Sequence, residues 1–64
     1  MMFYYVVYGI LANSGIEVVV RTFDNGMNIT DQEAREAAMD CELIVRRDEK
    51  YTSCRVSRRS MVFK

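Results

Sequence analysis

The sequence predicts a small α+β domain in which one short helix packs on an antiparallel sheet of four or five strands. The predicted order is β-β-α-β-β, which either ends there or continues into a further short strand. Segments with alternating apolar residues flank a single segment of helical periodicity. The chain has 64 residues, 50% of them hydrophobic and 28% charged, which suits one folded core and argues against disorder. Because it contains no proline or linker-like tract, we expect residues 1–64 to form a single domain.

The first two elements are expected to be strands joined as a hairpin. Residues 2–12 are uncharged and rich in tyrosine and valine, which favours a strand. Both faces of this strand are apolar, which is typical of a strand with a covered or central position. Asn13-Ser14-Gly15 predicts a compact turn, since Gly15 can adopt a positive φ. Residues 16–23 follow as the second strand, with one apolar and one mixed face.

The helix has a clear start. Thr30 is a suitable N-cap and Glu33 follows three residues later, which is the spacing of a capping box. The helix is expected to run from Asp31 to about Glu42. Its predicted buried stripe is made only of small residues, which allow close approach to a sheet; they are Ala34, Ala37, Ala38 and Cys41.

The segment after the helix is expected to return to strand. Leu43-Ile44-Val45 predicts the opening of a third strand that ends at Arg46 and Arg47, before a turn at residues 48–50. Residues 51–57 alternate as a fourth strand, with Cys54 on one face and Tyr51 and Arg55 on the other, solvated face. Arg58-Arg59-Ser60 is expected to interrupt it, and residues 61–63 form a short fifth strand or a continuation past a bulge.

The charges are strongly divided along the chain although the formal net charge is zero. Residues 1–45 carry 2 basic and 7 acidic side chains, whereas residues 46–64 carry 7 basic and 2 acidic ones. Such asymmetry favours steered association with a partner. We expect one acidic, helical side and one basic side formed by a C-terminal hairpin.

The residue types needed for common catalytic and metal sites are scarce. The chain has no histidine, no nucleotide-binding or nucleophile motif and only two cysteines. Two thiolates do not complete a zinc site, so we expect no metal, no cofactor and no enzymatic activity. Cys41 and Cys54 are expected to be reduced residues in or near the core, as in a cytoplasmic protein, although one bridge between them stays open as an alternative.

The residues expected to bind a partner are basic or aromatic. Arginine suits bidentate contact with phosphate or carboxylate, and tyrosine can anchor an interface or stack on bases. The alternative role for the arginines is a solvated sheet face whose charges block unwanted strand pairing. The alternative role for the tyrosines is core packing under the helix. The predicted partner-binding set is Arg46, Arg47, Arg55, Arg58, Arg59, Tyr4 and Tyr8.

One segment resembles small bacteriophage proteins that inhibit host enzymes or defence systems, such as inhibitors of bacterial RNA polymerase and compact anti-CRISPR proteins. Residues 24–47 carry the resemblance: a strand end, a turn, the alanine-rich helix "TDQEAREAAMDCE" and then a basic strand "LIVRR". The resemblance implies a small α+β inhibitor that acts by steric or electrostatic blockade. It transfers no catalytic residue.

The sequence therefore predicts a non-enzymatic inhibitor or adaptor that binds a host protein or ribonucleoprotein complex in a bacterial cytoplasm. One alternative is a module for single-stranded nucleic acid or RNA that uses a basic and aromatic sheet face. Another is a structural homodimer joined through an edge strand or an open sheet face. The apolar N-terminus lacks a basic leader and is too short to span a bilayer as a helix, so no membrane association is expected.

Overall fold

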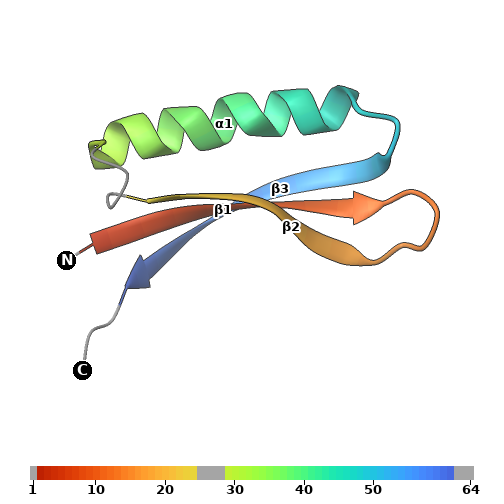
Figure 1. Cartoon of the computed structure of the whole chain (residues 1–64), viewed down its shortest axis with the longest axis horizontal. Helices are drawn as coiled ribbons and strands as arrows, with labels where there is room; N and C mark the ends of the chain where they lie inside the picture. The colour runs from red at the N-terminus through yellow and green to blue at the C-terminus, as the bar shows by residue number, and fades with distance from the viewer. Residues whose placement is uncertain (1, 25–28, 62–64) are drawn as a thin grey trace.

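The computed structural model describes residues 2–24 and 29–61, and it places one helix on a three-stranded antiparallel sheet (Figure 1). The elements are β1 (Met2–Leu11), β2 (Glu17–Asp24), α1 (Asp31–Arg47) and β3 (Tyr51–Met61). The strand order is β2-β1-β3. The predicted α+β class is confirmed, but the described residues form three strands instead of four or five.

The first two strands form the predicted hairpin, with β1 in the centre of the sheet. Gly15 has a φ of 72°, the left-handed conformation that its turn requires. The pairing of β1 with β2 shifts register between Val7 and Tyr8, which marks a bulge. The central position of β1 explains why both of its faces are apolar.

The helix begins as predicted but ends five residues later. Thr30 Oγ1 accepts from the Glu33 N–H at 3.1 Å, and the Glu33 carboxylate accepts from the Thr30 N–H at 3.0 Å, so the capping box is present. Hydrogen bonding to the Thr30 backbone lowers the pKa of Glu33. The predicted strand over residues 43–47 is wrong, because these residues complete α1.

The physical reason is that the last turn of α1 has a buried anchor. Val45 lies four residues after Cys41 and is buried on the same side as the small residues. Arg46 and Arg47 then stand at the negative end of the helix dipole, which they stabilise. The Asp48 N–H closes the helix by donating to the Val45 carbonyl at 3.1 Å.

The last strand is continuous. β3 pairs with β1 from Tyr51 to Met61, so Arg58-Arg59-Ser60 does not interrupt it. The long central strand provides a partner along this whole length. The remainder of the expected fifth strand, at positions 62 and 63, lies outside the described residues. No hairpin follows the helix within the part of the chain that the structure describes.

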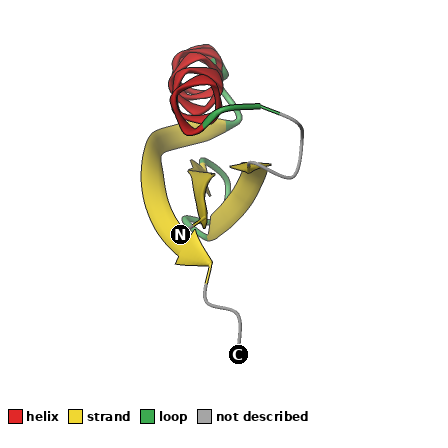
Figure 2. Ribbon diagram, turned by 90° about the vertical axis from the view of Figure 1, so that its left-hand side faces the viewer, coloured by secondary structure: helices red, strands yellow, loops and turns green. Residues whose placement is uncertain are grey.

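The core lies between α1 and one face of the sheet. Ala34 and Ala38 are fully buried, and Ala37 and Cys41 pack beside them, so the predicted small-residue stripe is confirmed. The sheet supplies the larger side chains of this core, namely Tyr5, Val7, Phe23 and Cys54. The end-on view in Figure 2 shows the helix over one face of the sheet, with no helix on the other.

Tyr51 belongs to this helix-covered face, where the sequence predicted a solvated position. The pairing of β1 with β3 shifts between Ile10 and Leu11, and this shift reverses the alternation at the start of β3. The Tyr51 ring lies over Gly9, where a Cβ would stand 2.6 Å from a ring carbon. Gly9 therefore makes room for the ring.

Candidate functional site on the open sheet face

The face of the sheet opposite α1 is here called the open sheet face. Side chains along β1 alternate between the two faces of the sheet. Tyr5 and Val7 point into the core under α1, so Tyr4, Val6 and Tyr8 point to the open sheet face. Residues paired across strands share a face. The open sheet face consists of Tyr4, Val6, Tyr8 and Ile10 of β1, Glu17, Val19, Thr22 and Asp24 of β2, and Ser53, Arg55, Ser57 and Arg59 of β3.

Tyr8 is the centre of the polar contacts on this face. The guanidinium of Arg55 lies 4.2 Å from the centroid of the Tyr8 ring, a cation–π contact. Arg59 donates from Nη2 to the Tyr8 hydroxyl at 3.3 Å. Two of the predicted arginines thus hold one of the predicted tyrosines on β1.

Arg55 also makes a bidentate ion pair with Glu17. Its Nη2 and Nε donate to the two carboxylate oxygens at 2.9 and 3.0 Å, which joins β3 to β2 across the central strand. The bond from Arg55 lowers the pKa of Glu17, and the carboxylate raises the pKa of Arg55. Both side chains remain substantially exposed, so the pair fixes geometry more than it adds stability.

Tyr4 lies at the other end of the same face. It pairs with Arg59 of β3 and with Asp24 of β2. Four of the seven predicted site residues therefore share the open sheet face, namely Tyr4, Tyr8, Arg55 and Arg59. Its charged residues also include Glu17 and Asp24, so the two arginines are balanced by two carboxylates.

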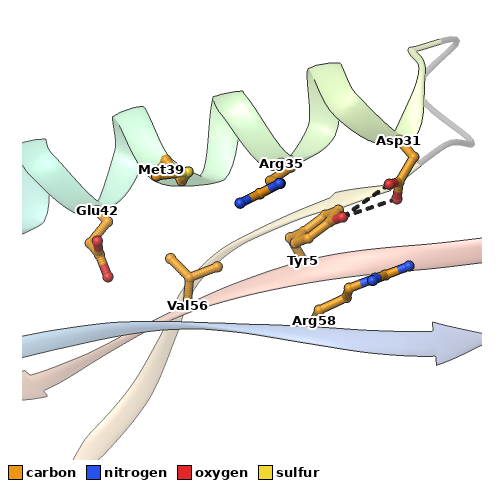
Figure 3. Close-up of a pocket in the computed structure, with 7 residues that line it drawn as sticks. All are labelled: Tyr5, Asp31, Arg35, Met39, Glu42, Val56 and Arg58. Atoms are coloured by element: carbon orange, nitrogen blue, oxygen red, sulfur yellow. Dashed lines mark hydrogen bonds between the residues drawn. The ribbon is translucent and has the colours of Figure 1, made fainter.

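Arg58 projects to the opposite side and lines a groove beneath α1 (Figure 3). Its guanidinium lies 3.8 Å from the centroid of the Phe3 ring. Arg35 reaches into the same groove from the helix, and Asp31 and Glu42 supply carboxylates. The groove thus contains side chains of both charges, and it is separate from the open sheet face.

A buried phenol forms the floor of this groove. The Tyr5 hydroxyl donates to the Asp31 carboxylate, at 3.1 and 3.2 Å from its two oxygens (Figure 3). Burial raises the pKa of Tyr5, and the hydrogen bond to Asp31 raises it further. This contact ties the first turn of α1 to the central strand and has a structural role.

Arg46 and Arg47 are on the last turn of α1, so the prediction of a basic C-terminal hairpin that includes them is wrong. Arg46 donates from Nη2 to the Cys54 carbonyl at 3.0 Å and lies 3.6 Å from the Glu42 carboxylate. It connects the helix end to β3. The basic residues are thus divided among the open sheet face, the groove and the helix end.

The two cysteines lie in or near the core. Both thiols are free, with Cys54 buried and Cys41 half-buried. Burial raises the pKa of Cys54, which keeps its thiol protonated. Within residues 2–24 and 29–61, no group of three or more His, Cys, Asp or Glu side chains could hold a metal ion. The single described helix is neither long nor apolar enough to cross a membrane.

Sequence patterns alone missed Glu17 as a member of the site. It appeared to be an ordinary solvated strand residue, and only the pairing of both outer strands with β1 brings it to Arg55. Comparison of the chain with protein-family models, with curated proteins and with solved structures found no match.

Proposed function

We propose that the chain is a non-enzymatic binding module that docks on another protein through the open sheet face. The observation that carries the proposal is the convergence of Tyr4, Tyr8 and Arg59 on a face that no element of the described chain covers. Tyrosine and arginine are the residue types that supply much of the binding energy at protein interfaces. Val19, with 58% of its surface exposed, adds apolar area on β2.

A protein partner fits this face better than a nucleic acid does. The guanidinium of Arg55 already occupies one side of the Tyr8 ring, so a base would have to displace it in order to stack there. Glu17 and Asp24 stand on the same face, and their carboxylates repel phosphates. A mixed set of charges and hydroxyl groups instead suits the polar rim and aromatic anchors of a protein interface.

Such a module would act by occupying a surface of its target. An inhibitor or adaptor needs no catalytic group, and a small rigid sheet face is sufficient to block a larger assembly. A bacterial host complex, such as a polymerase or a CRISPR effector, is the target class to test first, because the resemblance implies a phage-type inhibitor in a bacterial cytoplasm. Of the segment that carries the resemblance, the helix from Asp31 is present, whereas residues 43–47 are helical and not the basic strand.

The test compares matched charge reversals in a binding assay. The tagged chain captures its partner from bacterial lysate, mass spectrometry identifies the partner, and the affinity of the purified pair is then measured. Arg59→Glu should weaken binding about tenfold or more, since it removes an arginine and its contact with Tyr8. Lys50→Glu makes the same charge change in the turn before β3 and should leave the affinity unchanged.

Two results would contradict the proposal. The first is equal weakening by both variants, which would indicate a general charge effect. The second is tight binding to a single-stranded RNA oligonucleotide with a steep dependence on salt, which would favour the nucleic-acid alternative.

A further inference from the structure

Tyr8 brings two guanidinium groups to one aromatic ring on the open sheet face. Tyr8 pairs with Arg55 across the sheet, and the Arg55 guanidinium lies 4.2 Å from the centre of its ring. The Tyr8 hydroxyl extends toward Arg59, which donates to it at 3.3 Å. Val6 lies between these two positions on the same face and is only 5% exposed. Two positive charges are thus held near each other on the outside of the sheet.

Of these two guanidinium groups, only Arg55 has a carboxylate partner among residues 2–24 and 29–61. Arg55 binds both carboxylate oxygens of Glu17, at 2.9 and 3.0 Å. Arg59 makes no ion pair with any described residue, and its hydrogen bond ends on the neutral Tyr8 hydroxyl. A neutral acceptor does not compensate a positive charge. Because a guanidinium has five N–H donors, most donors of Arg59 remain available to a partner.

Asp24 does not compensate the charge of Arg59. The two residues are level with each other in the sheet, but Tyr4 of the central strand lies between them. Neighbouring strands are about 4.8 Å apart, so the backbones of the two outer strands are separated by about 10 Å at this level. No ion pair joins the Asp24 carboxylate to Arg59. Arg59 is exposed, and its charge faces solvent.

We propose that the partner of the open sheet face places an acidic side chain, aspartate or glutamate, on Arg59. This inference rests on the proposed function and names the chemistry of its partner. The Arg55–Glu17 pair shows the same kind of contact on the same face, with a guanidinium that lies against Tyr8 and binds a carboxylate through two N–H donors. Arg59 is held by the same tyrosine, so it offers a positioned guanidinium whose planar donors suit both oxygens of a carboxylate.

A carboxylate fits this position better than a phosphate does. Glu17 and Asp24 stand on the same face and carry negative charges of their own. They would repel the nearly double charge of a phosphorylated side chain, or the closely spaced charges of a nucleic acid, more strongly than the single charge of a carboxylate. An arginine–carboxylate contact across an interface also fixes which way the partner docks, because like charges in a wrong orientation are unfavourable.

The first test uses a hexaglutamate peptide as the probe and does not need the natural partner. Its binding to the full chain is followed by NMR titration, and the amide signals that move most should be those around Tyr8 and Arg59. Arg59→Gln should weaken binding about fivefold or more, and Tyr8→Phe, which removes only the hydroxyl that holds Arg59, should weaken it about threefold. Arg47→Gln removes the same charge at the end of α1 and is the matched control.

The second test uses the partner that is captured in the assay described for the proposed function. Each acidic residue at the interface of that partner is changed to arginine in turn, and its affinity is measured for the wild-type chain and for Arg59→Glu. One change should weaken binding to the wild-type chain about tenfold and restore binding to Arg59→Glu, because opposite charges then meet again. The same change should remain weakened with Lys50→Glu, which lies in the turn before β3.

The possible failures are distinguishable from one another. If Arg59→Glu binds the captured partner as tightly as the wild-type chain does, the open sheet face is not the docking site and both proposals are wrong. If Arg59→Glu weakens binding but no acidic residue of the partner restores it, only the acidic contact is wrong. Equal weakening of hexaglutamate binding by Arg59→Gln and Arg47→Gln would also overturn the acidic contact, as would tighter binding of a phosphoserine peptide of the same length.

Discussion

Tyr5 and Tyr8 lie three residues apart on β1 but belong to different environments. Tyr5 is buried under α1, and its hydroxyl donates to Asp31 of the helix. Tyr8 lies on the open sheet face, where Arg55 covers its ring and Arg59 binds its hydroxyl. The same residue type thus holds the fold together on one side of the sheet and, on the other side, stands on the face proposed for binding.

This difference predicts how substitutions should divide. Changes on the helix-covered face should reduce the free energy of unfolding, because they act on close packing. Changes to the exposed residues of the open sheet face should leave unfolding nearly unchanged and alter recognition instead; Val6, which is only 5% exposed at the centre of that face, is the exception. A binding variant that also unfolds the domain would contradict this division.

The largest effect is expected for Ala38→Leu. Ala38 has no exposed surface, and the added atoms would push α1 away from the sheet. We expect a loss of about 1–3 kcal/mol of unfolding free energy, measured by chemical denaturation. Gln32→Leu introduces the same side chain at an exposed position of α1 and serves as the control. A stable Ala38→Leu variant would show that the helix does not lie this close to the sheet.

The second effect concerns Gly9→Ala on the same face. The new methyl group would stand 2.6 Å from the Tyr51 ring, so the ring must move and lose its packing. We expect a cost of about 1–2 kcal/mol, at the lower end of the overpacking range because Tyr51 is only half-buried. In a Tyr51→Ala background the same substitution should cost much less. Equal costs in both backgrounds would mean that the ring is not responsible.

Local patterns were sufficient to predict the first half of the fold. The hairpin, the N-cap at Thr30 and the small buried stripe all follow from short-range chemistry, and the structure confirms them. The helix end was different, because Leu43-Ile44-Val45 is favourable for a strand by propensity alone. Burial of Val45 against the sheet outweighs that preference. The position of Val45 one helical turn after Cys41 was a signal in the sequence that the helix continues to this residue.

The site was only partly predictable for a related reason. Alternation along β1 and β3 was enough to place Tyr4, Tyr8 and Arg55 on strand faces. It could not reveal that β3 runs unbroken through Arg59, nor that Glu17 meets Arg55, because both facts depend on strand order and register. Pairing across three strands is a long-range property that local periodicity does not contain.

A smaller effect is expected for Tyr5→Phe. The variant keeps the buried ring and loses one hydrogen bond to a half-exposed carboxylate, so the cost should be about 0.5–1.5 kcal/mol. The raised pKa of Tyr5 also gives a sign for the dependence on pH. The contribution of the Tyr5 hydroxyl to the free energy of unfolding is fully present below the ordinary tyrosine pKa of about 10. It is lost as pH rises through the higher pKa of the folded state.

An absorbance titration of phenolate formation tests this expectation. One of the four tyrosines should ionise late in the folded chain, and that late step should be absent in Tyr5→Phe. Tyr8→Phe is the control on the open sheet face. If its titration also lost the late step, the assignment to Tyr5 would be wrong.

The smallest effect is expected from the Glu17–Arg55 pair on the open sheet face. The pKa of Glu17 is lowered in the folded chain. The contribution of its carboxylate to stability is therefore present above the ordinary glutamate pKa of about 4.3 and is lost as pH falls through the lower pKa of the folded state. Glu17→Gln should therefore reduce the acid sensitivity of the denaturation midpoint only slightly, because the pair is exposed to solvent.

Glu33 has a lowered pKa of its own from the capping box, so some acid sensitivity should remain in Glu17→Gln. Glu49→Gln, in the turn before β3, provides a control for the loss of one carboxylate.

The same variants separate an effect on stability from an effect on recognition. Freeing Arg55 from Glu17 should change the affinity for the partner more than it changes the denaturation midpoint. A large drop in the midpoint for Glu17→Gln would mean that the open sheet face holds the fold together as much as the helix-covered face does.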